Sequence, residues 1–347
     1  MANGIVGVDI GSGSLRAVEV MDAAGSKPSV IRYHEVALPE GAVASGEVVE
    51  LNTVASALRS LWTSGGFKSR DVVLGMGNQR VLARDLTVPK MSLDQIREAL
   101  PFQVQDLLLV PVADAILDFY PISEGVGENG PVVNGLLVAA VKQAVLANVR
   151  AAELAGLNPV GVDLIPFALS RVHLRGLAAR GTIALIDVGS TTTSVIIAIN
   201  GVPQFVRIIP AGGNDITRAL ATRLEVSPDQ AEQIKRGLGL SAAGVAPEHR
   251  VALEAIFESA NQLLTSLRNT LSYFVNARQQ EGIGRIVLSG GGAKLRGFDA
   301  ALSEITKLPV SASNPFGEVN VNKAAIKADG SGETMSVALG LALGSKA

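Results

Sequence analysis

The chain has 347 residues, of which 48% are hydrophobic, and its 30 Lys and Arg residues nearly balance its 32 Asp and Glu residues. This length allows about two domains with large buried cores, and the balanced charge argues against a nucleic-acid coat or a polybasic membrane patch. The absence of cysteine excludes disulfides, thiolate metal sites and cysteine nucleophiles, and it favours a cytosolic protein.

Short apolar runs alternate with amphipathic segments along the chain. Strands are predicted at 4–10, 14–20, 30–37, 72–76, 115–122, 135–141, 158–162, 182–187, 192–199, 202–209 and 284–288. Helices are predicted at 51–64, 92–109, 142–155, 163–175, 213–224, 227–236, 248–280, 295–306 and 335–344. This interleaving is typical of an α/β protein. We expect no signal peptide and no membrane-spanning helix, since no apolar run approaches about 18 residues.

Three segments rich in small and polar residues are predicted to be loops. They are a hairpin-like loop at 123–134, a hinge or loop at 237–247, and a loop-rich region at 311–334. The long helix at 248–280 carries apolar residues at steps of three or four, and this stripe predicts core packing.

The most informative feature is an internal repeat. The segment Ile5–Val20 (IVGVDIGSGSLRAVEV) is similar to Ile183–Ala198 (IALIDVGSTTTSVIIA). Both contain an apolar strand, an Asp, a Gly-Ser turn and a second apolar strand, and every match has the same offset of about half the chain. The simplest architecture is therefore two similar halves that face each other.

Each repeat places a turn without bulky side chains directly after an aspartate. Such turns expose backbone N–H groups that can surround phosphate oxygens, and Asp9 or Asp187 at the strand end could hold Mg²⁺ directly or through water. Each turn taken alone could also be an ordinary tight hairpin. Two of them, facing each other, predict a clamp for a polyphosphate and its cation.

Two further features could bind the rest of a nucleotide. The turn Ser289-Gly290-Gly291-Gly292 lies between a predicted strand and a helix, so it is either a plain connection or a backbone platform beside a sugar or base. Glu232 and Lys235 are three residues apart on one helix face. They could be a surface ion pair or a polar grip on ribose and base.

Together these motifs resemble those of the actin/Hsp70/sugar-kinase superfamily: two phosphate hairpins, an adenosine turn and a helix beside the base. The segment Ser336–Gly344 (SVALGLALG) is similar to the second connecting helix of that superfamily. The resemblance spans residues 5–344. It implies an actin-like α/β fold, in which two similar ribonuclease-H-like halves enclose an interdomain nucleotide cleft.

The middle region resembles the PilM family more specifically. Val88-Pro89-Lys90-Met91-Ser92 is followed by Glu98-Ala99, and Pro111–Phe119 (PVADAILDF) has the family's proline, acidic, Leu-Asp and aromatic positions. Val162-Asp163 and Phe167-Ala168-Leu169 also fit its first connecting segment. PilM proteins are cytoplasmic components of type IV pilus assembly that resemble the division protein FtsA.

This resemblance implies an FtsA-type subdomain arrangement. Domain I (1–178) would contain subdomain 1A (1–83, 157–178 and the C-terminal 335–347) and an inserted subdomain 1C (84–156). Domain II (179–334) would contain subdomain 2A (179–213 and 281–334) and a helical subdomain 2B (214–280).

The resemblance also implies ATP or ADP with Mg²⁺ in the cleft, and it assigns roles by motif. The residues implied to bind the nucleotide are Gly11, Ser12, Gly13, Ser14, Arg16, Gly189, Ser190, Thr191, Thr192, Gly212, Gly213, Glu232, Lys235, Gly290, Gly291, Gly292 and Lys294. Asp9 and Asp187 would hold Mg²⁺, mostly through water. Catalytic residues are not assigned, although Asp163 and Asp187 are weak candidates.

Two positions depart from the relatives. Arg16 stands where a Lys is common, which keeps the charge but changes its geometry. Ile165 stands where many relatives have a polar or acidic residue in the region that orients the attacking water. An isoleucine cannot orient water or accept its proton, so we expect nucleotide binding with slow or absent hydrolysis.

The family resemblance implies a cytoplasmic ATP-binding scaffold that is recruited to the inner membrane face by a partner. That partner would be a bitopic pilus protein similar to PilN, whose short N-terminal cytoplasmic tail lies in a groove between 1A and 1C. Self-association remains open. The alternatives are an FtsA-like division ATPase, although no amphipathic C-terminal helix is found here, or a phosphotransferase of the sugar-kinase type.

Overall fold

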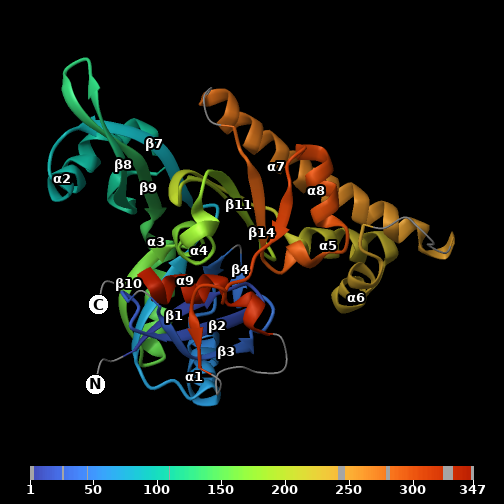
Figure 1. The fold of residues 1–347 in the computed structure, drawn as a ribbon. Coiled ribbons are helices and arrows are strands. Elements are labelled where there is room, and N and C mark those ends of the chain that lie inside the picture. The colour runs from blue at the N-terminus through green and yellow to red at the C-terminus, as the bar shows by residue number, and fades with distance from the viewer. Residues whose placement is uncertain are drawn as a thin grey trace.

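The structure is a computed structural model that describes residues 4–25, 27–44, 46–108, 110–240, 247–278, 282–322 and 331–344. Two large mixed sheets lie in two halves of the molecule, and a smaller sheet projects from the first half (Figure 1). Within the described segments, no helix combines the length and apolar character needed to cross a membrane.

The first sheet has the strand order β10-β6-β1-β2-β3-β16. Strands β1, β2 and β3 form an antiparallel meander, and β6 and β10 run parallel to β1 on its other side. The bounds of these strands are β1 Ile5–Ile10, β2 Ser14–Met21, β3 Ser29–Ala37, β6 Asp71–Met76, β10 Asn158–Leu164 and β16 Asn320–Val321. A short pair, β4 (Val43–Ala44) and β5 (Glu47–Val48), follows β3.

The second sheet repeats this arrangement in the order β13-β12-β11-β14-β15. Here too a three-stranded antiparallel meander is extended by two strands that run parallel to its first strand. The bounds are β11 Thr182–Val188, β12 Thr193–Ile199, β13 Val202–Ile209, β14 Arg285–Ser289 and β15 Val310–Ala312. The prediction of two similar halves is therefore confirmed, and β15 is a strand that the sequence patterns did not indicate.

The third sheet, β7-β9-β8, is inserted in the chain between β6 and β10; it is a separate ladder, and its strands contact β13 of the second sheet. It consists of β7 (Val81–Pro89), β8 (Ala115–Gly127) and β9 (Gly130–Val141), with helix α2 (Leu93–Gln103) packed on β8. A capping box formed by Ser92 and Gln95 begins α2.

This insertion corrects two predictions. Residues 123–134 are not a loop, because β8 and β9 continue through them as a long hairpin that turns at Glu128-Asn129. The Gly and Asn residues in this segment are typical of loops, so local propensity did not indicate strands. These strands are stabilised by pairing with each other rather than by propensity. Strand β7 was missed, because Arg84 and Asp85 interrupt its apolar pattern.

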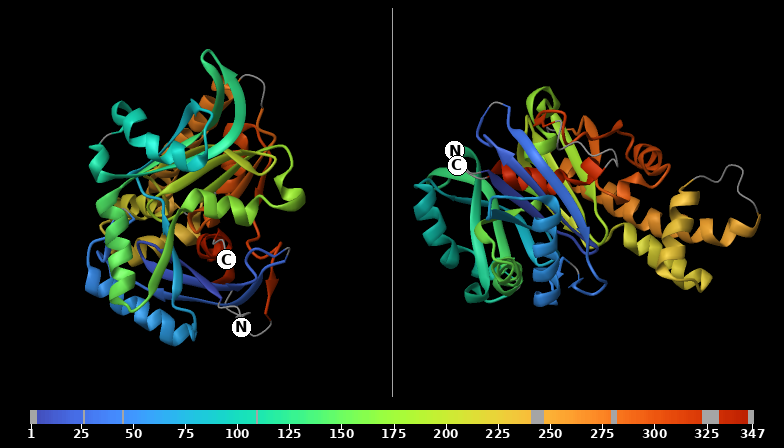
Figure 2. Two further views of the ribbon diagram at one scale, coloured as in Figure 1. Left: turned by 90° about the vertical axis from the view of Figure 1, so that its left-hand side faces the viewer. Right: turned by 90° about the horizontal axis from the view of Figure 1, so that it is seen from below.

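Helices α1 (Leu51–Gly65) and α3 (Lys142–Leu154) cover the outer face of the first sheet. Helices α4 (Ile165–His173) and α9 (Ser336–Gly344) lie between the two large sheets, as two views show (Figures 1 and 2). Helix α9 packs on β1, and α4 packs on α9 and on the second sheet.

The contact between α4 and α9 is made by backbone rather than by large side chains. A Cβ added at Gly340 would lie 2.0 Å from the carbonyl oxygen of Ala168, and one added at Gly7 would lie 1.9 Å from that of Ala338. Helix α9 can therefore approach both β1 and α4 only because these two positions are glycine.

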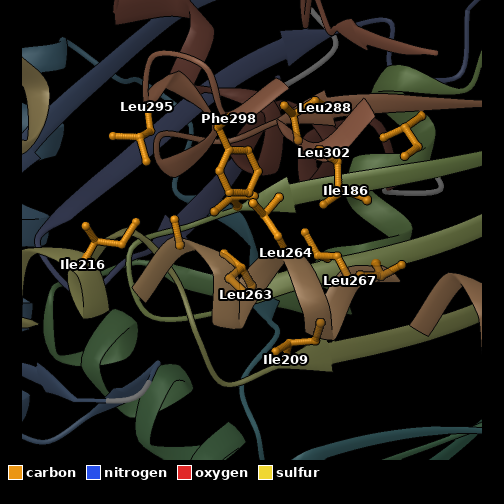
Figure 3. Close-up of a cluster of buried hydrophobic side chains, with 14 of the residues drawn as sticks. Ile186, Ile209, Ile216, Leu263, Leu264, Leu267, Leu288, Leu295, Phe298 and Leu302 are labelled. Carbon is orange, nitrogen blue, oxygen red and sulfur yellow. The ribbon is translucent and has the colours of Figure 1, made fainter. Parts of the chain in front are cut away.

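The outer face of the second sheet is covered by helices. They are α5 (Gly213–Leu224), α6 (Pro228–Leu238), α7 (Arg250–Ala277) and α8 (Phe298–Thr306). Their core places Leu263, Leu264 and Leu267 of α7 against Phe298 and Ile186 (Figure 3). The predicted apolar stripe of α7 is buried, which confirms its role in packing.

Several predicted bounds need adjustment. The helix predicted at 92–109 ends at Gln103 and is followed by a 3₁₀ turn at Gln105–Leu107, while the one predicted at 295–306 begins only at Phe298. Parts of two predicted loops, 241–246 and 323–330, lie outside the described residues, as do 1–3 and 345–347 of the predicted subdomain 1A.

Candidate functional site: a cavity between the two halves

A cavity of about 670 Å³ lies where the two large sheets face each other. Its wall is built from the ends of β1, β11 and β14, from the first turns of α4, α5 and α9, and from one face of α6. Residues predicted for the nucleotide site that line it are Asp9, Gly11, Ser12, Arg16, Asp187, Gly189, Ser190, Thr191, Thr192, Gly213, Glu232, Lys235, Gly290, Gly291, Gly292 and Lys294.

The two hairpins of the repeat have the same turn and meet at their tips. The N–H of Gly11 donates to the carbonyl of Ser14 at 3.0 Å, and the N–H of Gly189 donates to that of Thr192 at 2.9 Å. The hydroxyls of Ser12 and Ser190 are hydrogen-bonded at 2.6 Å. Hydroxyls from both halves therefore lie at one point of the cavity, where they can form hydrogen bonds to the same bound group.

On the first half, the carboxylate at the strand end is paired. Arg16 contacts Asp9 at 3.2 Å and Glu35 at 3.0 Å, so its guanidinium is held between two carboxylates at the cavity edge. Burial raises the pKa of Asp9, and the charge of Arg16 opposes that rise. The charge of Arg16 therefore offsets part of the effect of burial on Asp9.

On the second half, the equivalent carboxylate has no such partner. Burial raises the pKa of Asp187 to about 6, a hydrogen bond from Ser289 lowers it, and the charge of Asp9 raises it. Among the described residues Asp187 forms no ion pair. A buried carboxylate whose pKa is raised by a second carboxylate, beside small-residue turns, fits a divalent cation that would relieve the repulsion.

Helix α6 contributes a hydrogen-bonded cluster to the cavity wall. Lys235 is buried and donates to the carbonyl of Gly213 at 3.0 Å, to the hydroxyl of Thr217 at 2.8 Å and to Glu232 at 2.6 Å. Since an ammonium group has three protons, Lys235 is fully committed to this cluster. It positions Glu232 and has no proton left for a ligand.

Glu232 is the centre of that cluster. It also accepts from Thr217 at 2.7 Å and from Arg236 at 2.8 Å. Partial burial acts to raise its pKa, but the hydrogen bonds from Lys235, Thr217 and Arg236 outweigh this and lower the pKa to about 2. Glu232 is therefore a fixed anion at neutral pH, and its remaining lone pairs can accept hydrogen bonds.

The three positions after β14, Gly290, Gly291 and Gly292, differ in whether packing requires glycine there. A Cβ at Gly290, where φ is +92°, would lie 2.3 Å from the carbonyl oxygen of Val188, and one at Gly292 would lie 2.6 Å from the side chain of Val188. Both are required by packing. A Cβ at Gly291 would contact nothing within 4 Å, although this residue lines the cavity.

The first turn of α5 is occupied by the second hairpin. The N–H of Gly213 donates to the carbonyl of Gly189 at 2.9 Å, and the N–H of Asn214 donates to that of Ser190 at 2.8 Å. The side chain of Asp215 accepts from the N–H of Gly212 at 2.7 Å. The N–H groups of Gly213 and Asn214 thus hold the hairpin in place, that of Gly212 caps α5, and all three are already hydrogen-bonded within the protein.

Some predicted residues lie outside the cavity wall. Gly13, Ser14 and Gly212 do not line it. Asp163 also lies outside it, and its carboxylate is paired with Arg171 and accepts from the N–H of Leu164. Its neighbour Ile165 does line the cavity, packed against Gly75 and Gly77 at the end of β6.

The polar cavity residues that the sequence analysis did not assign to the site are Glu35, Ser194, Asn214, Arg236, Ser289, Thr334 and Ser336. Glu35 is placed by its register opposite Arg16 on β3, for which the sequence carries no signal. Arg236 could have been found, because it lies four residues after Glu232 on the same helix.

Behind the cavity, a buried histidine gives a prediction about pH. Burial lowers the pKa of His173 to about 4. The unfolded chain therefore binds a proton between about pH 6.5 and 4 that the folded chain does not. Stability should be lost as the pH falls through that window, by about 3 kcal/mol in total from this group.

Denaturant unfolding at pH 7 and pH 4.5 tests this prediction. His173→Gln cannot titrate, so the variant should lose less stability between the two pH values than the native chain does. An identical pH dependence of the two proteins would show that His173 titrates normally.

Comparisons with known proteins agree with this fold. A family model described as type IV pilus assembly protein PilM matches residues 7–346. One chain of a solved PilM–PilN type IV pilus biogenesis complex has a TM-score of 0.82 and 28% identity, with coverage of 98% of this chain and 97% of that one.

More distant relatives share the fold. The cell division protein FtsA of Bacillus subtilis is 23% identical over 350 residues, covering 89% of this chain and 78% of FtsA. MreB5 of Spiroplasma citri, solved with ADP, has a TM-score of 0.53 and 14% identity, with coverage of 98% and 95%. Since the family match spans nearly the whole chain, this protein belongs to the PilM family of type IV pilus assembly proteins.

Proposed function

We propose that this protein is an actin-like scaffold of type IV pilus assembly that binds Mg²⁺ and ATP, or ADP, in the cavity between its halves. The observation that carries the proposal is the meeting of two Asp-x-Gly-Ser hairpins at one point of that cavity. Turns of this kind present N–H groups and hydroxyls to phosphate oxygens.

The phosphates would lie against Gly11 and Ser12 on one side and Gly189, Ser190 and Thr191 on the other. The Asp9 and Asp187 carboxylates would hold the cation, whose charge would neutralise the phosphates. The described residues contain no group of three metal-binding side chains, which fits a cation held chiefly by phosphate oxygens and water.

The nucleoside would lie between α6 and the turn after β14. The fixed carboxylate of Glu232 can accept hydrogen bonds from ribose hydroxyls, and Lys235 holds it for that purpose. The open surface at Gly291 leaves room for a flat base or sugar against the backbone.

The residues around the cavity also support the proposal that ATP is hydrolysed slowly or not at all. The position at the start of α4 is the apolar Ile165, and the nearby carboxylate of Asp163 is committed to Arg171. A general base must reach the attacking water within hydrogen-bond distance. Neither side chain meets that requirement, so ATP would serve as a structural ligand.

A pair of glycine variants separates nucleotide contact from packing. Gly291 has φ −66° and ψ −36°, so Gly291→Ala should fold normally but weaken ATP binding severalfold by placing a methyl group in the cavity. Gly290→Ala should instead destabilise the fold by about 2 kcal/mol or more, because of its positive φ and its clash with Val188.

Thermal unfolding and ATP titration of both variants test this pair. Unchanged ATP affinity in Gly291→Ala would contradict the proposed place of the nucleoside. An unchanged melting temperature in Gly290→Ala would contradict the packing argument.

We further propose that the protein binds a short N-terminal cytoplasmic tail of a bitopic inner-membrane protein similar to PilN, and is held at the membrane by it. The support is the similarity to a chain of the PilM–PilN complex. The subdomains would be those expected from the sequence, 1A with an inserted 1C and 2A with a helical 2B. The inserted sheet β7-β9-β8 gives 1C its own core.

An apolar surface suits such a tail. Leu146 and Leu154 of α3 and Val160 and Val162 of the edge strand β10 are between 39% and 51% exposed. Val162 is paired with Leu74, which is buried beneath α1 and α3, so Val162 lies on the face that α3 covers. We call these four residues the α3–β10 patch; the elements that carry them, α3 and β10, directly follow the inserted sheet in the chain (Figure 1).

Binding of a labelled PilN-like tail peptide, followed by fluorescence anisotropy, tests this role. We expect a Kd on the order of 10 µM and at least about fivefold weaker binding by Val160→Asp, which places a charge in the patch. Val251→Asp is the matched control, because Val251 is similarly exposed (46%) on α7 in the other half. Equal losses in both variants, or no binding with ATP present, would refute the proposed surface.

A further inference from the structure

Three polar side chains from three elements meet behind the cavity. Asp187 is the penultimate residue of β11 and Ser289 is the last residue of β14. The two are directly paired in the parallel ladder, so their side chains share one face. Because the two side chains are neighbours on that face, the Ser289 hydroxyl can donate to the Asp187 carboxylate, and this interaction acts to lower the pKa of Asp187. On its other side, Ser289 Oγ lies 3.4 Å from Nε2 of His173 at the end of α4.

The proton positions in this chain follow from what each group can do. A carboxylate only accepts hydrogen bonds, so the hydrogen bond between Ser289 and Asp187 uses the one proton of the Ser289 hydroxyl. Its oxygen can then only accept from His173. The histidine is 6% exposed and its pKa is lowered to about 4, so at neutral pH it is uncharged and must carry its proton on Nε2.

We propose that His173 is a positioning residue of the metal–nucleotide site: it fixes the Ser289 hydroxyl so that this hydroxyl holds the Asp187 carboxylate in place. Asp187 and Ser289 both line the cavity, while His173 does not. His173 therefore acts on a bound ligand only through Ser289.

This arrangement links the metal–nucleotide site to α4 and α9, the two helices that lie between the large sheets. His173 belongs to α4, which packs on α9 and on the second sheet. Among the described residues, Asp187 forms no ion pair that would fix its position. Through Ser289 and His173, its position therefore depends on α4, the helix that follows the inserted subdomain and β10.

This inference rests on the proposed function, and the test uses the full chain with a fluorescent ATP analogue. The quantity measured is the Mg²⁺ concentration that gives half-maximal binding of the analogue. Ser289→Ala should raise this midpoint about tenfold, and His173→Leu about threefold, because the first removes the hydrogen bond and the second only its restraint. His173→Gln, which keeps an N–H donor, should restore most of the native midpoint.

The double variant Ser289→Ala/His173→Leu decides whether the two residues act as one unit. It should match Ser289→Ala alone, because His173 has nothing left to position. Multiplied effects of the two substitutions, or a native midpoint in His173→Leu, would overturn the proposal. Failure of His173→Gln to bind better than His173→Leu would reduce His173 to a packing role.

A second measurement does not depend on nucleotide binding. Nitrogen-15 NMR of the imidazole at pH 7 should show His173 neutral with the proton on Nε2, and the Nδ1-protonated form would overturn the inference. If the native chain showed this tautomer but bound no Mg²⁺-nucleotide, the proposed function would fail while the hydrogen-bond chain stood.

Discussion

Asp187→Asn is expected to weaken the binding of Mg²⁺-ATP by at least about tenfold and, at the same time, to stabilise the nucleotide-free protein. The loss of affinity follows from removing one of the two charges that would hold the cation. Asparagine has nearly the same shape and can still accept the hydrogen bond from Ser289, so the cavity should keep its geometry.

The gain in stability follows from the pKa of Asp187, which is raised from 3.8 to about 6. A carboxyl whose folded pKa is raised binds its proton more tightly in the folded state, so stability falls as the pH rises from about 4 to 6 and stays lower at pH 7. Asparagine removes this penalty, which is about 3 kcal/mol.

Asp163→Asn is the matched control, because Asp163 lies outside the cavity and is paired with Arg171. It should leave Mg²⁺-ATP affinity unchanged and should not stabilise the protein. Calorimetric titration and denaturant unfolding at pH 7 distinguish the two variants. Native affinity in Asp187→Asn would mean that the cavity does not bind the metal as proposed.

Gly340→Ala is expected to destabilise the protein by about 3 kcal/mol, although alanine is the better helix former. The added Cβ would lie 2.0 Å from the backbone oxygen of Ala168, so α4 and α9 would have to separate. The first turns of both helices line the cavity, at Ile165 and at Ser336, and ATP binding should therefore weaken as well.

The same substitution should have the opposite effect in an open helix. A Cβ at Gly237 of α6 would contact nothing within 4 Å, so Gly237→Ala should stabilise the protein by about 0.5–1 kcal/mol. Thermal and denaturant unfolding of both variants test this contrast. A stabilised Gly340→Ala variant would show that the helices are not held as closely as described.

The sequence predicted the fold because its main signal was local and repeated. Each hairpin carries its aspartate, its glycine and its two apolar strands within 16 residues, and the repeat implied the common architecture. Strand β7 and the continuation of strands β8 and β9 through residues 123–134 were missed because their stability comes from pairing across the inserted sheet, which local propensity does not record.

Of the candidate site, the sequence predicted only the residues that belong to local motifs. The motifs located the hairpins, the glycine turn and the helix of Glu232. They did not locate Glu35, which reaches Arg16 through the register of β2 and β3, or His173, which reaches Ser289 from another layer. Contacts between elements far apart in the chain depend on packing, and no spacing in the sequence encodes them.

The most direct test of the proposed function is the fate of ATP bound to the purified protein. After long incubation with Mg²⁺-ATP and removal of free nucleotide, the bound fraction would be identified by chromatography. If the protein holds ATP as a structural ligand, ATP should remain bound and intact, and Asp187→Asn should retain little. Steady conversion to ADP, or a native chain that retains no nucleotide, would contradict the account.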